Sequence, residues 1–296
     1  MTRIHADLVL LFCAAIWGFA FLFQKGAMEH VGPWTFVGAR GFVAAAVLLP
    51  LAVLEHRWRA RTQPSVAGTR RIAALSAIAG LAFLAAALLQ QEGLKTASVT
   101  NASFLTALYV VITPFLSFLV SGRALAPTIW LAAALSFVGT WLLGGGTGDG
   151  FGGFQHGEGL VALSAVFWSA HVLIVAGGAR FERPVLFTAL QFVVVGALGL
   201  AGAALFETVT LASLLAASGD ILFVGILSSA LTFTLFTWAL RVTSPAEAAI
   251  IASTETLFAS FAGWLVLNER MTQAALVGAA AILAAIVIVQ LRRQRD

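Results

Sequence analysis

Apolar residues occupy most of the chain in long blocks, and short polar or glycine-rich connections separate one block from the next. A helix that crosses a bilayer needs about 20 mainly apolar residues, and ten blocks approach or reach that length. The pattern therefore predicts an all-α polytopic membrane protein with ten transmembrane helices. Their expected ranges are 7–28, 34–54, 71–90, 97–120, 127–144, 158–178, 185–206, 219–240, 246–267 and 272–291.

The connections carry residues that start and stop helices. Gly32-Pro33 separates the first two blocks, and the basic link 55–71 is the longest polar loop expected. Residues 144–157 form a glycine-rich connection between the fifth and sixth blocks. The segment Ser244–Glu247 has the form of a capping box with proline at the first helical position, and Pro127 opens the fifth block in a similar way.

The chain matches itself at a nearly constant offset, which indicates an internal repeat. A shift of 146 residues places Leu94 on Leu240 and Tyr109 on Glu255, and an apolar span follows each copy. A shift of 151 residues places Trp17 on Trp168 in the earlier part of the chain. We therefore expect two repeats of five helices each, 1–146 and 147–296.

An odd number of helices in each repeat has a topological consequence. The second repeat must cross the membrane in the opposite sense to the first, and such inverted repeats are a known architecture of secondary transporters. Most cations lie in connections on the side of the two termini, so the positive-inside rule places both termini in the cytoplasm. These cations are Arg3, Arg57, Arg59, Arg61, Arg70, Arg71, Arg123, Arg180, Arg183, Arg241, Arg292, Arg293 and Arg295. The opposite side has only Lys25, Lys95 and Arg270.

Composition excludes several other classes. The chain is 60% hydrophobic and 10% charged, whereas an ordinary soluble domain is roughly 25% charged. The net charge of +4 comes from arginines in the connections, so it indicates topology and lipid contact and not nucleic-acid binding. Cys13 is the only cysteine, so no intrachain disulfide can form, and we expect no metal and no cofactor. The apolar run 8–23 is too long for a signal peptide and is expected to be the first span.

Several motifs together resemble the drug/metabolite transporter superfamily, and specifically its bacterial EamA-type members. The resemblance implies ten helices, two repeats, export as the direction, and a central cavity walled mainly by the first, third, fourth, sixth, eighth and ninth helices. Thr256 stands where the family usually has proline, and Arg123 occupies the place of Glu269 in the first copy. The matching stretches are Ile16-Trp17-Gly18, Gly32-Pro33 with Arg40, 89–94, 104–106, 113–115, 253–259, Gly263-Trp264 and 268–270.

Glu255 and His171 are the ionisable groups expected deep within spans. An unpaired carboxylate at the midplane costs several kcal/mol, so Glu255 should face the bundle and either protonate or pair. It is a candidate for proton coupling or for binding a substrate amine, and the alternative is a structural carboxyl bonded to serines of the eighth helix. His171 lies on the same helical face as Trp168, either as a satisfied core residue or as a proton relay. No acidic neighbour suggests metal ligation.

Trp17 and Trp168 occupy equivalent mid-span positions, although tryptophan usually prefers the membrane interface. They are expected either to wall a polar cavity or to lie in the core with the indole N–H on a hydroxyl such as that of Ser164. Arg40 lies within the second span. It either snorkels to the surface or pairs with Glu92 as a structural strut or outer gate.

Neutral polar side chains gather in the first, third and fourth spans, and some of them are expected to line the transport route. Such a lining suits an amphipathic or zwitterionic cargo better than a strongly anionic one. These residues are Gln24, Gln90, Gln91, Asn101, Thr106 and Tyr109. Alanine-rich stretches such as 44–46 and 85–87 permit close contacts between helices.

These observations predict a secondary carrier that exports small polar or amphipathic metabolites by alternating access, with amino acids, their derivatives and drugs all open. Its expected partners are a small-molecule substrate and the lipid bilayer, with protons as one energy source, and it is expected as a monomer or loose homodimer in the bacterial inner membrane. A passive facilitator or channel is the alternative. A membrane-embedded enzyme is weakly suggested by the GxGD pattern at 146–149, which lacks a second intramembrane aspartate. No nucleotide-binding P-loop is present.

Overall fold

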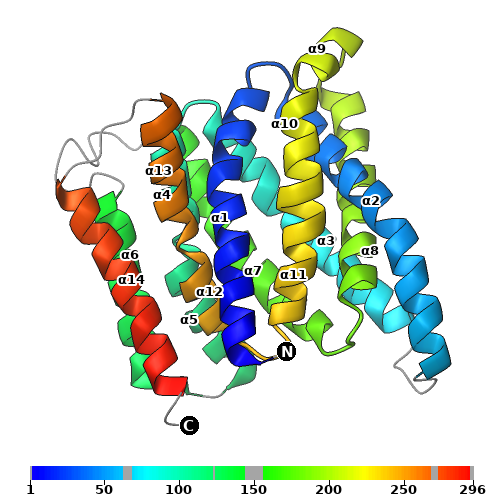
Figure 1. Ribbon diagram of the computed structural model, residues 1–296. Coiled ribbons are helices and arrows are strands. Elements are labelled where there is room, and N and C mark those ends of the chain that lie inside the picture. Colours follow the sequence, from blue (N-terminus) through cyan, green and yellow to red (C-terminus); the bar gives the residue numbers. More distant parts are fainter. Residues whose placement is uncertain (1, 63–68, 123, 144–155, 268–272, 294–296) are drawn as a thin grey trace.

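The computed structural model describes residues 2–62, 69–122, 124–143, 156–267 and 273–293, and these residues are almost entirely helical (Figure 1). The first repeat contains α1 (Arg3–Ala27), α2 (Pro33–Thr62), α3 (Thr69–Leu94), α4 (Val99–Thr106), α5 (Tyr109–Ser121) and α6 (Pro127–Leu143). The second contains α7 (His156–Ala179), α8 (Pro184–Phe206), α9 (Leu211–Ala216), α10 (Ser218–Phe223), a π-helical segment (Val224–Leu231), α11 (Thr232–Ala239), α12 (Pro245–Ala252), α13 (Glu255–Leu267) and α14 (Gln273–Arg293).

The helices in the described part of the chain form ten membrane crossings in two repeats of opposite direction. In the described residues, eight helical segments are long and apolar enough to cross a membrane, and 127–142 and 276–289 are shorter apolar helices. α1 begins and α14 ends at the lower end of Figure 1, hereafter the termini side, and α7 starts at the opposite end, the far side. The two repeats are therefore inverted, as the odd helix number predicts. The expected boundary between residues 146 and 147 lies outside the described residues.

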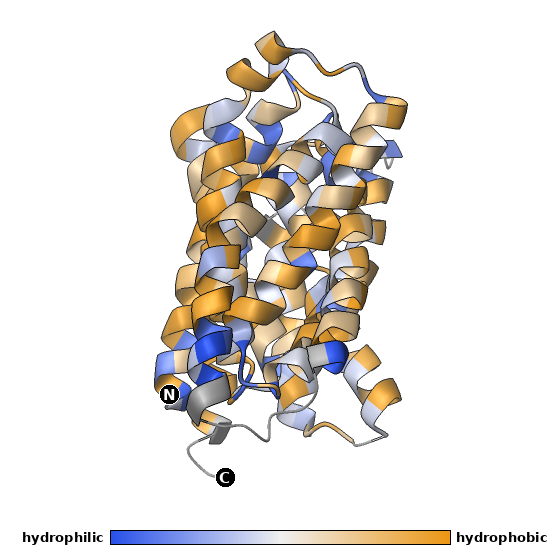
Figure 2. Ribbon diagram, turned by 90° about the vertical axis from the view of Figure 1, so that its right-hand side faces the viewer, coloured by the Kyte–Doolittle hydropathy of each residue, from blue (hydrophilic) through white to orange (hydrophobic). Residues whose placement is uncertain are grey.

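Hydropathy follows the expected membrane orientation. Apolar positions cover the middle of the bundle, while polar positions gather toward its two ends (Figure 2). Large apolar side chains such as Leu8, Phe42, Leu81 and Leu198 are exposed on the outside of the bundle. Because water would penalise such a surface, this belt is the part of the molecule that lipid covers.

α2 and α8 form an antiparallel pair through glycines. A Cβ atom added to Gly38 would lie 2.5 Å from the backbone nitrogen of Leu200, and one added to Gly199 would lie 2.5 Å from Gly38 Cα. Gly41 and Gly196 make a similar approach farther along the pair. Small residues permit this backbone contact, which is the usual way in which helices associate within a bilayer.

The ends of this pair are capped in the same way in both repeats. Glu207 accepts hydrogen bonds from the backbone N–H groups of Trp34 at 2.9 Å and Thr35 at 2.8 Å. Glu55 accepts from the N–H groups of Val185 and Leu186, the residues that align with 34 and 35. Each carboxylate therefore satisfies the free N–H groups at the start of the partner helix.

The fourth and ninth crossings are broken at equivalent positions. The sequence predicts them as continuous helices, 97–120 and 246–267, and this detail is wrong. Short i→i−3 hydrogen bonds start at residues 108, 110 and 111 and recur at 254, 256 and 257, which is the 146-residue offset of the repeat. In the second copy, hydroxyl groups of Ser253, Thr254 and Thr256 bond to backbone carbonyls one turn earlier, a contact that competes with regular helix geometry.

Two further boundaries differ from the expectation, and two agree with it. α2 continues to Thr62, so much of the predicted loop 55–71 is helical, and the eighth crossing contains the π-helical segment. The capping box of Ser244 and Glu247 is present with Pro245 at the start of α12, and α6 begins at Pro127. The helix caps could therefore be predicted from the sequence, whereas the breaks and the π-helical segment within crossings could not.

Candidate functional site

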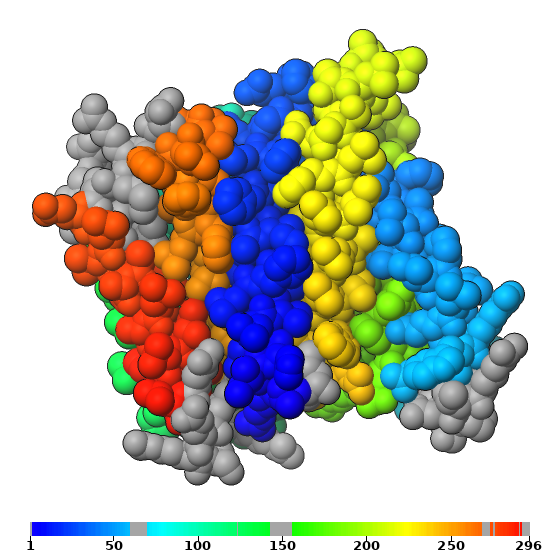
Figure 3. Space-filling view, viewed as in Figure 1, coloured from blue at the N-terminus to red at the C-terminus, as the bar shows by residue number. Residues whose placement is uncertain are grey.

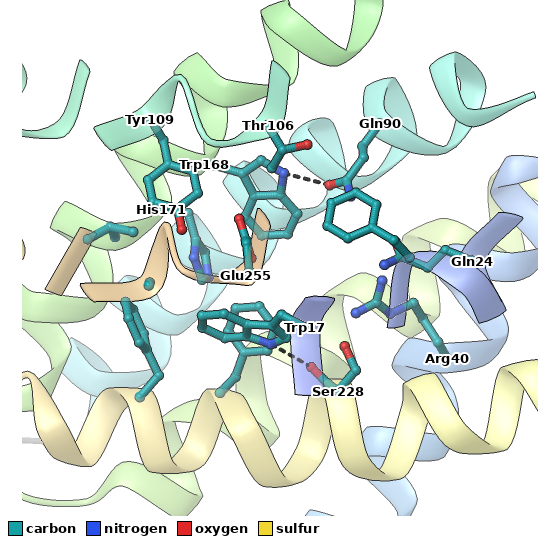
Figure 4. A pocket seen from close by; sticks show the side chains of 15 residues that line it. Trp17, Gln24, Arg40, Gln90, Thr106, Tyr109, Trp168, His171, Ser228 and Glu255 are labelled. Carbon is teal, nitrogen blue, oxygen red and sulfur yellow. Dashed lines mark hydrogen bonds between the residues drawn. The ribbon is translucent and has the colours of Figure 1, made fainter. Parts of the chain in front are cut away.

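A buried cavity lies in the middle of the bundle, and both repeats line it (Figure 4). The space open to a water-sized sphere is about 60 Å³. A single water needs roughly 10–15 Å³ by the same measure, so the cavity holds a few small groups but is far smaller than a site for a drug-sized ligand. Its walls come from α1, α2, α3, α4, α5, α7, the π-helical segment, α11, α12 and α13.

The two helix breaks supply Glu255 and Tyr109 to this cavity. Glu255 is the first residue of α13, Tyr109 is the first residue of α5, and both are buried. Their side chains are close enough to interact directly, and neither the Tyr109 hydroxyl nor Glu255 Oε1 has a further partner among the described residues. The expected alternative, a Glu255 carboxyl bonded to serines of the eighth helix, has no support among the hydrogen bonds of the described residues.

The two aligned tryptophans line the cavity and donate hydrogen bonds across the bundle (Figure 4). Trp17 Nε1 donates to the Ser228 carbonyl at 3.1 Å, and Trp168 Nε1 donates to Gln90 Oε1 at 2.8 Å. The expected partner Ser164 instead donates to the Val161 carbonyl. Both indoles therefore have fixed orientations, with their rings forming apolar walls.

His171 and Thr106 add polar atoms that other described residues leave unsatisfied. His171 Nε2 is 3.1 Å from Gln191 Oε1, but its Nδ1 has no partner in the described part of the chain. The Thr106 hydroxyl also lacks a partner there. Buried polar groups are normally bonded, so these two atoms leave hydrogen-bonding capacity free at the wall of the cavity.

Arg40 faces the same cavity from α2 and is 3% exposed. Its Nε donates to Ser229 Oγ at 3.0 Å. The expected pair with Glu92 is absent, because Glu92 lies at the surface and binds Lys95 Nζ at 2.9 Å. Snorkelling is also wrong, since the guanidinium stays buried among the rings of Phe36 and Phe83.

Three other expected residues fall differently. Gln24 lines the cavity, whereas Gln91 is buried beside it and donates to the Gln24 carbonyl at 3.4 Å. Asn101 donates to Glu158 Oε1 at 3.0 Å and does not line the cavity. Gln90 and Thr106, two of the neutral polar residues of which some were expected along the transport route, both line the cavity. The sequence did not indicate the remaining lining residues, which have only apolar or helical surroundings in the chain: Phe21, Val172, Ser228, Phe233, Phe236 and Ala252.

The far side of the cavity is closed by α1. Lys25 Nζ donates to the backbone carbonyls of Leu94 at 2.6 Å and Ala97 at 3.0 Å, in the connection from α3 to α4. Deeper in the bundle, a Cβ on Gly18 would lie 2.5 Å from the Glu255 carbonyl oxygen. Figure 3, which shows the bundle from the side, has α1 packed between the orange helices α12 and α13 and the yellow helices α10 and α11.

The termini side is different. A hollow of about 750 Å³ lies between α5, α7, α11 and the start of α12. Its wall includes Leu173, which follows the cavity residue Val172 in α7. The repeat offset aligns Lys25 with Ala176, which lines this hollow and whose methyl group is too short to close it. The surface around Lys25 is thus in contact with its neighbours on the far side, whereas the aligned surface around Ala176 is separated from its neighbours by the hollow on the termini side.

The described residues contain no group of three His, Cys, Asp or Glu side chains that could hold a metal ion.

The EamA-like transporter family model matches residues 4–145 and 155–291. An uncharacterized transporter of Archaeoglobus fulgidus is 28% identical over 290 residues, which is 98% of this chain and 87% of that protein. A solved crystal structure superposes with a TM-score of 0.76 over 99% of both chains at 19% identity, which shows a shared fold.

Proposed function

Because the chain belongs to the EamA-like transporter family, and is therefore a multi-pass membrane transporter and no enzyme, we propose that it is a secondary carrier of small polar or amphipathic metabolites. The cavity between the repeats would be its binding site, with Trp17, Trp168, Tyr109 and Glu255 among the residues that contact the cargo. Aromatic walls suit an apolar body, and unsatisfied polar atoms suit a polar head group.

The unequal ends of the cavity are the observation that carries this proposal. Contact between α1 and α13 and the Lys25 bonds seal the far side, while the aligned surfaces on the termini side leave a hollow. Two inverted repeats can exchange these packings, because each repeat can adopt the arrangement that the other one has. This exchange would open the cavity to one side at a time, which is alternating access.

Glu255 is the proposed coupling group. It starts a half-helix at the midplane, where the N-terminal end of α13 favours negative charge and burial without a cation disfavours it. A carboxyl held between these opposing effects can exchange a proton with the open side or bind a cationic part of the cargo. His171 and Tyr109 line the same cavity and would tune this exchange.

We infer the location and the direction of transport from the arginine distribution and from the resemblance to the family. The positive-inside rule supports cytoplasmic termini, and the hollow would then open to the cytoplasm. This suits an exporter in the bacterial inner membrane that loads from inside the cell. The expectation of a monomer or loose homodimer stays a prediction.

The test combines cells with a reconstituted system. Overexpressing cells should lose or resist specific metabolites, and the purified protein should transport those same compounds in proteoliposomes. Saturable flux with stimulation by cargo on the opposite side supports a carrier. Linear flux that cargo on the opposite side leaves unchanged supports a passive facilitator, and no flux of any released compound contradicts the proposal.

A further inference from the structure

The guanidinium of Arg40 is a buried cation that lacks an acidic partner among the described residues. Arg40 is 3% exposed, and the ion pairs of the described residues join other side chains. Glu255 lines the same cavity, but none of the ion pairs found among the described residues joins it to Arg40. An uncompensated charge inside a membrane span costs free energy. An arginine kept at such a position is therefore expected to serve a function that offsets this cost.

The local structure orients this guanidinium toward the cavity. Nε is bound by Ser229 Oγ at 3.0 Å, and the guanidinium carbon lies 5.3 Å from the centre of the Phe83 ring. These contacts fix the plane of the group and leave its two terminal nitrogens directed into the cavity (Figure 4). The π-helical segment contributes to this arrangement, because its adjacent residues Ser228 and Ser229 contact Trp17 and Arg40 respectively.

The packing of the repeats does not itself require an arginine. The repeat offset aligns Arg40 with Gln191, which occupies the equivalent place on α8 and whose Oε1 lies 3.1 Å from His171 Nε2. The α2–α8 pair therefore accepts an uncharged amide at the related position. The positive charge is specific to one half of the cavity, which points to a ligand and not to the scaffold.

We propose that Arg40 binds the carboxylate of the transported molecule and thereby selects a cargo with a single negative charge and an apolar body. This inference rests on the proposed carrier function. The two terminal nitrogens match the two oxygens of a planar carboxylate. A dianionic phosphate is disfavoured because the cavity offers one cation and also contains Glu255. The rings of Trp17, Phe21 and Phe233 suit the apolar body.

Matched acid and amide pairs test this assignment. The probes are 4-methylpentanoate with 4-methylpentanamide, and 3-phenylpropanoate with 3-phenylpropanamide, since each pair differs in charge and hardly in shape. Binding to purified full-length protein in nanodiscs is measured by calorimetry. Wild type should bind the acid of at least one pair roughly tenfold or more tightly than its amide, as expected for a charge-assisted pair of hydrogen bonds.

The variant R40Q introduces the residue that the second repeat already has at this position. It should lose the preference for the acid while keeping amide affinity within about twofold, and R40K should keep part of the preference because it retains charge without the planar fork. S229A should weaken acid binding more than amide binding. Thermal unfolding checks that each variant is folded, and if R40Q does not fold, R40K and S229A decide.

Three results overturn the assignment. The first is wild-type protein that shows no preference for the acid, or that binds neither member of a pair. The second is R40Q with the preference intact, and the third is R40K and S229A that both behave like wild type. Failure of the carrier function is recognised separately. If proteoliposomes transport other cargo that lacks a carboxylate, the carrier stands and only the role of Arg40 falls. If they transport nothing that the cells release, the proposed function itself falls.

Discussion

Replacement of Lys25 should release the far-side closure. The variant K25M keeps the length and apolar stem of the side chain but removes the ammonium that binds the carbonyls of Leu94, Lys95 and Ala97 at 2.6, 3.3 and 3.0 Å. Those bonds join α1 to the connection between α3 and α4, and we expect them to break when the far side opens. Their loss therefore favours the far-side-open packing.

The size of the effect follows from these bonds. A hydrogen bond with a charged donor contributes about 1.5–3 kcal/mol net, but Lys25 is partly exposed and one of its bonds is long, so solvent regains part of that energy. A total loss of about 2 kcal/mol is expected, which shifts the equilibrium roughly 30-fold, since 1.4 kcal/mol corresponds to a factor of ten.

Thiol labelling measures this shift. Cys13 is the only cysteine, so a C13S background with T106C provides one reporter in the cavity. A membrane-impermeant reagent is added separately to each side of membranes of known orientation. K25M should raise the labelling rate from the far side by at least about tenfold and lower it from the termini side.

The aligned residue Ala176 offers a matched control. A176M places the same methionine side chain in the hollow but removes no bond, so it should not raise far-side labelling. A176K places an ammonium near the carbonyls of residues 240, 241 and 243, which align with the partners of Lys25, and should slow labelling from the termini side. Unchanged far-side labelling in K25M would refute the idea of a lysine closure.

Two further substitutions test the coupling group and the packing beside it. E255Q should make transport insensitive to an imposed proton gradient, because Arg40, His171 and Tyr109 are then the ionisable groups that remain around the position. Counterflow at several pH values checks this. An unaltered pH dependence and rate would exclude Glu255 as the coupling group. G18L forces α1 away from α13 and should lower stability by about 1–3 kcal/mol in thermal unfolding. G159A has nothing within 4 Å of the new Cβ and should be neutral, and equal effects of the two glycine changes would contradict tight packing at Gly18.

Much of the fold was predictable because its signals are local. Apolar blocks identified the crossings, and the Ser244 and Glu247 cap involves residues three positions apart. The repeat offset also aligned Tyr109 with Glu255, which the structure brings together at the two helix breaks. The breaks themselves were hidden, since each half-helix is apolar and the hydroxyl contacts that disturb the backbone also occur in regular helices.

Partners from distant helices were harder to predict. Arg40 could bind a surface acid, water or a hydroxyl, and the choice of Ser229 depends on how the second repeat packs against α2. Gln90 and Gln91 are neighbours about 100° apart on α3, so only the rotation of that helix against α7 decides which one reaches the cavity. Trp168 then binds Gln90 and not the expected hydroxyl.

The most direct measurement is counterflow in proteoliposomes that contain a compound released by overexpressing cells. A carrier whose cavity opens to one side at a time exchanges labelled external cargo for unlabelled internal cargo. Labelled cargo should therefore accumulate transiently above its equilibrium level, with saturable kinetics and with a weaker overshoot in K25M. Simple equilibration without an overshoot, at a rate proportional to concentration, would contradict alternating access.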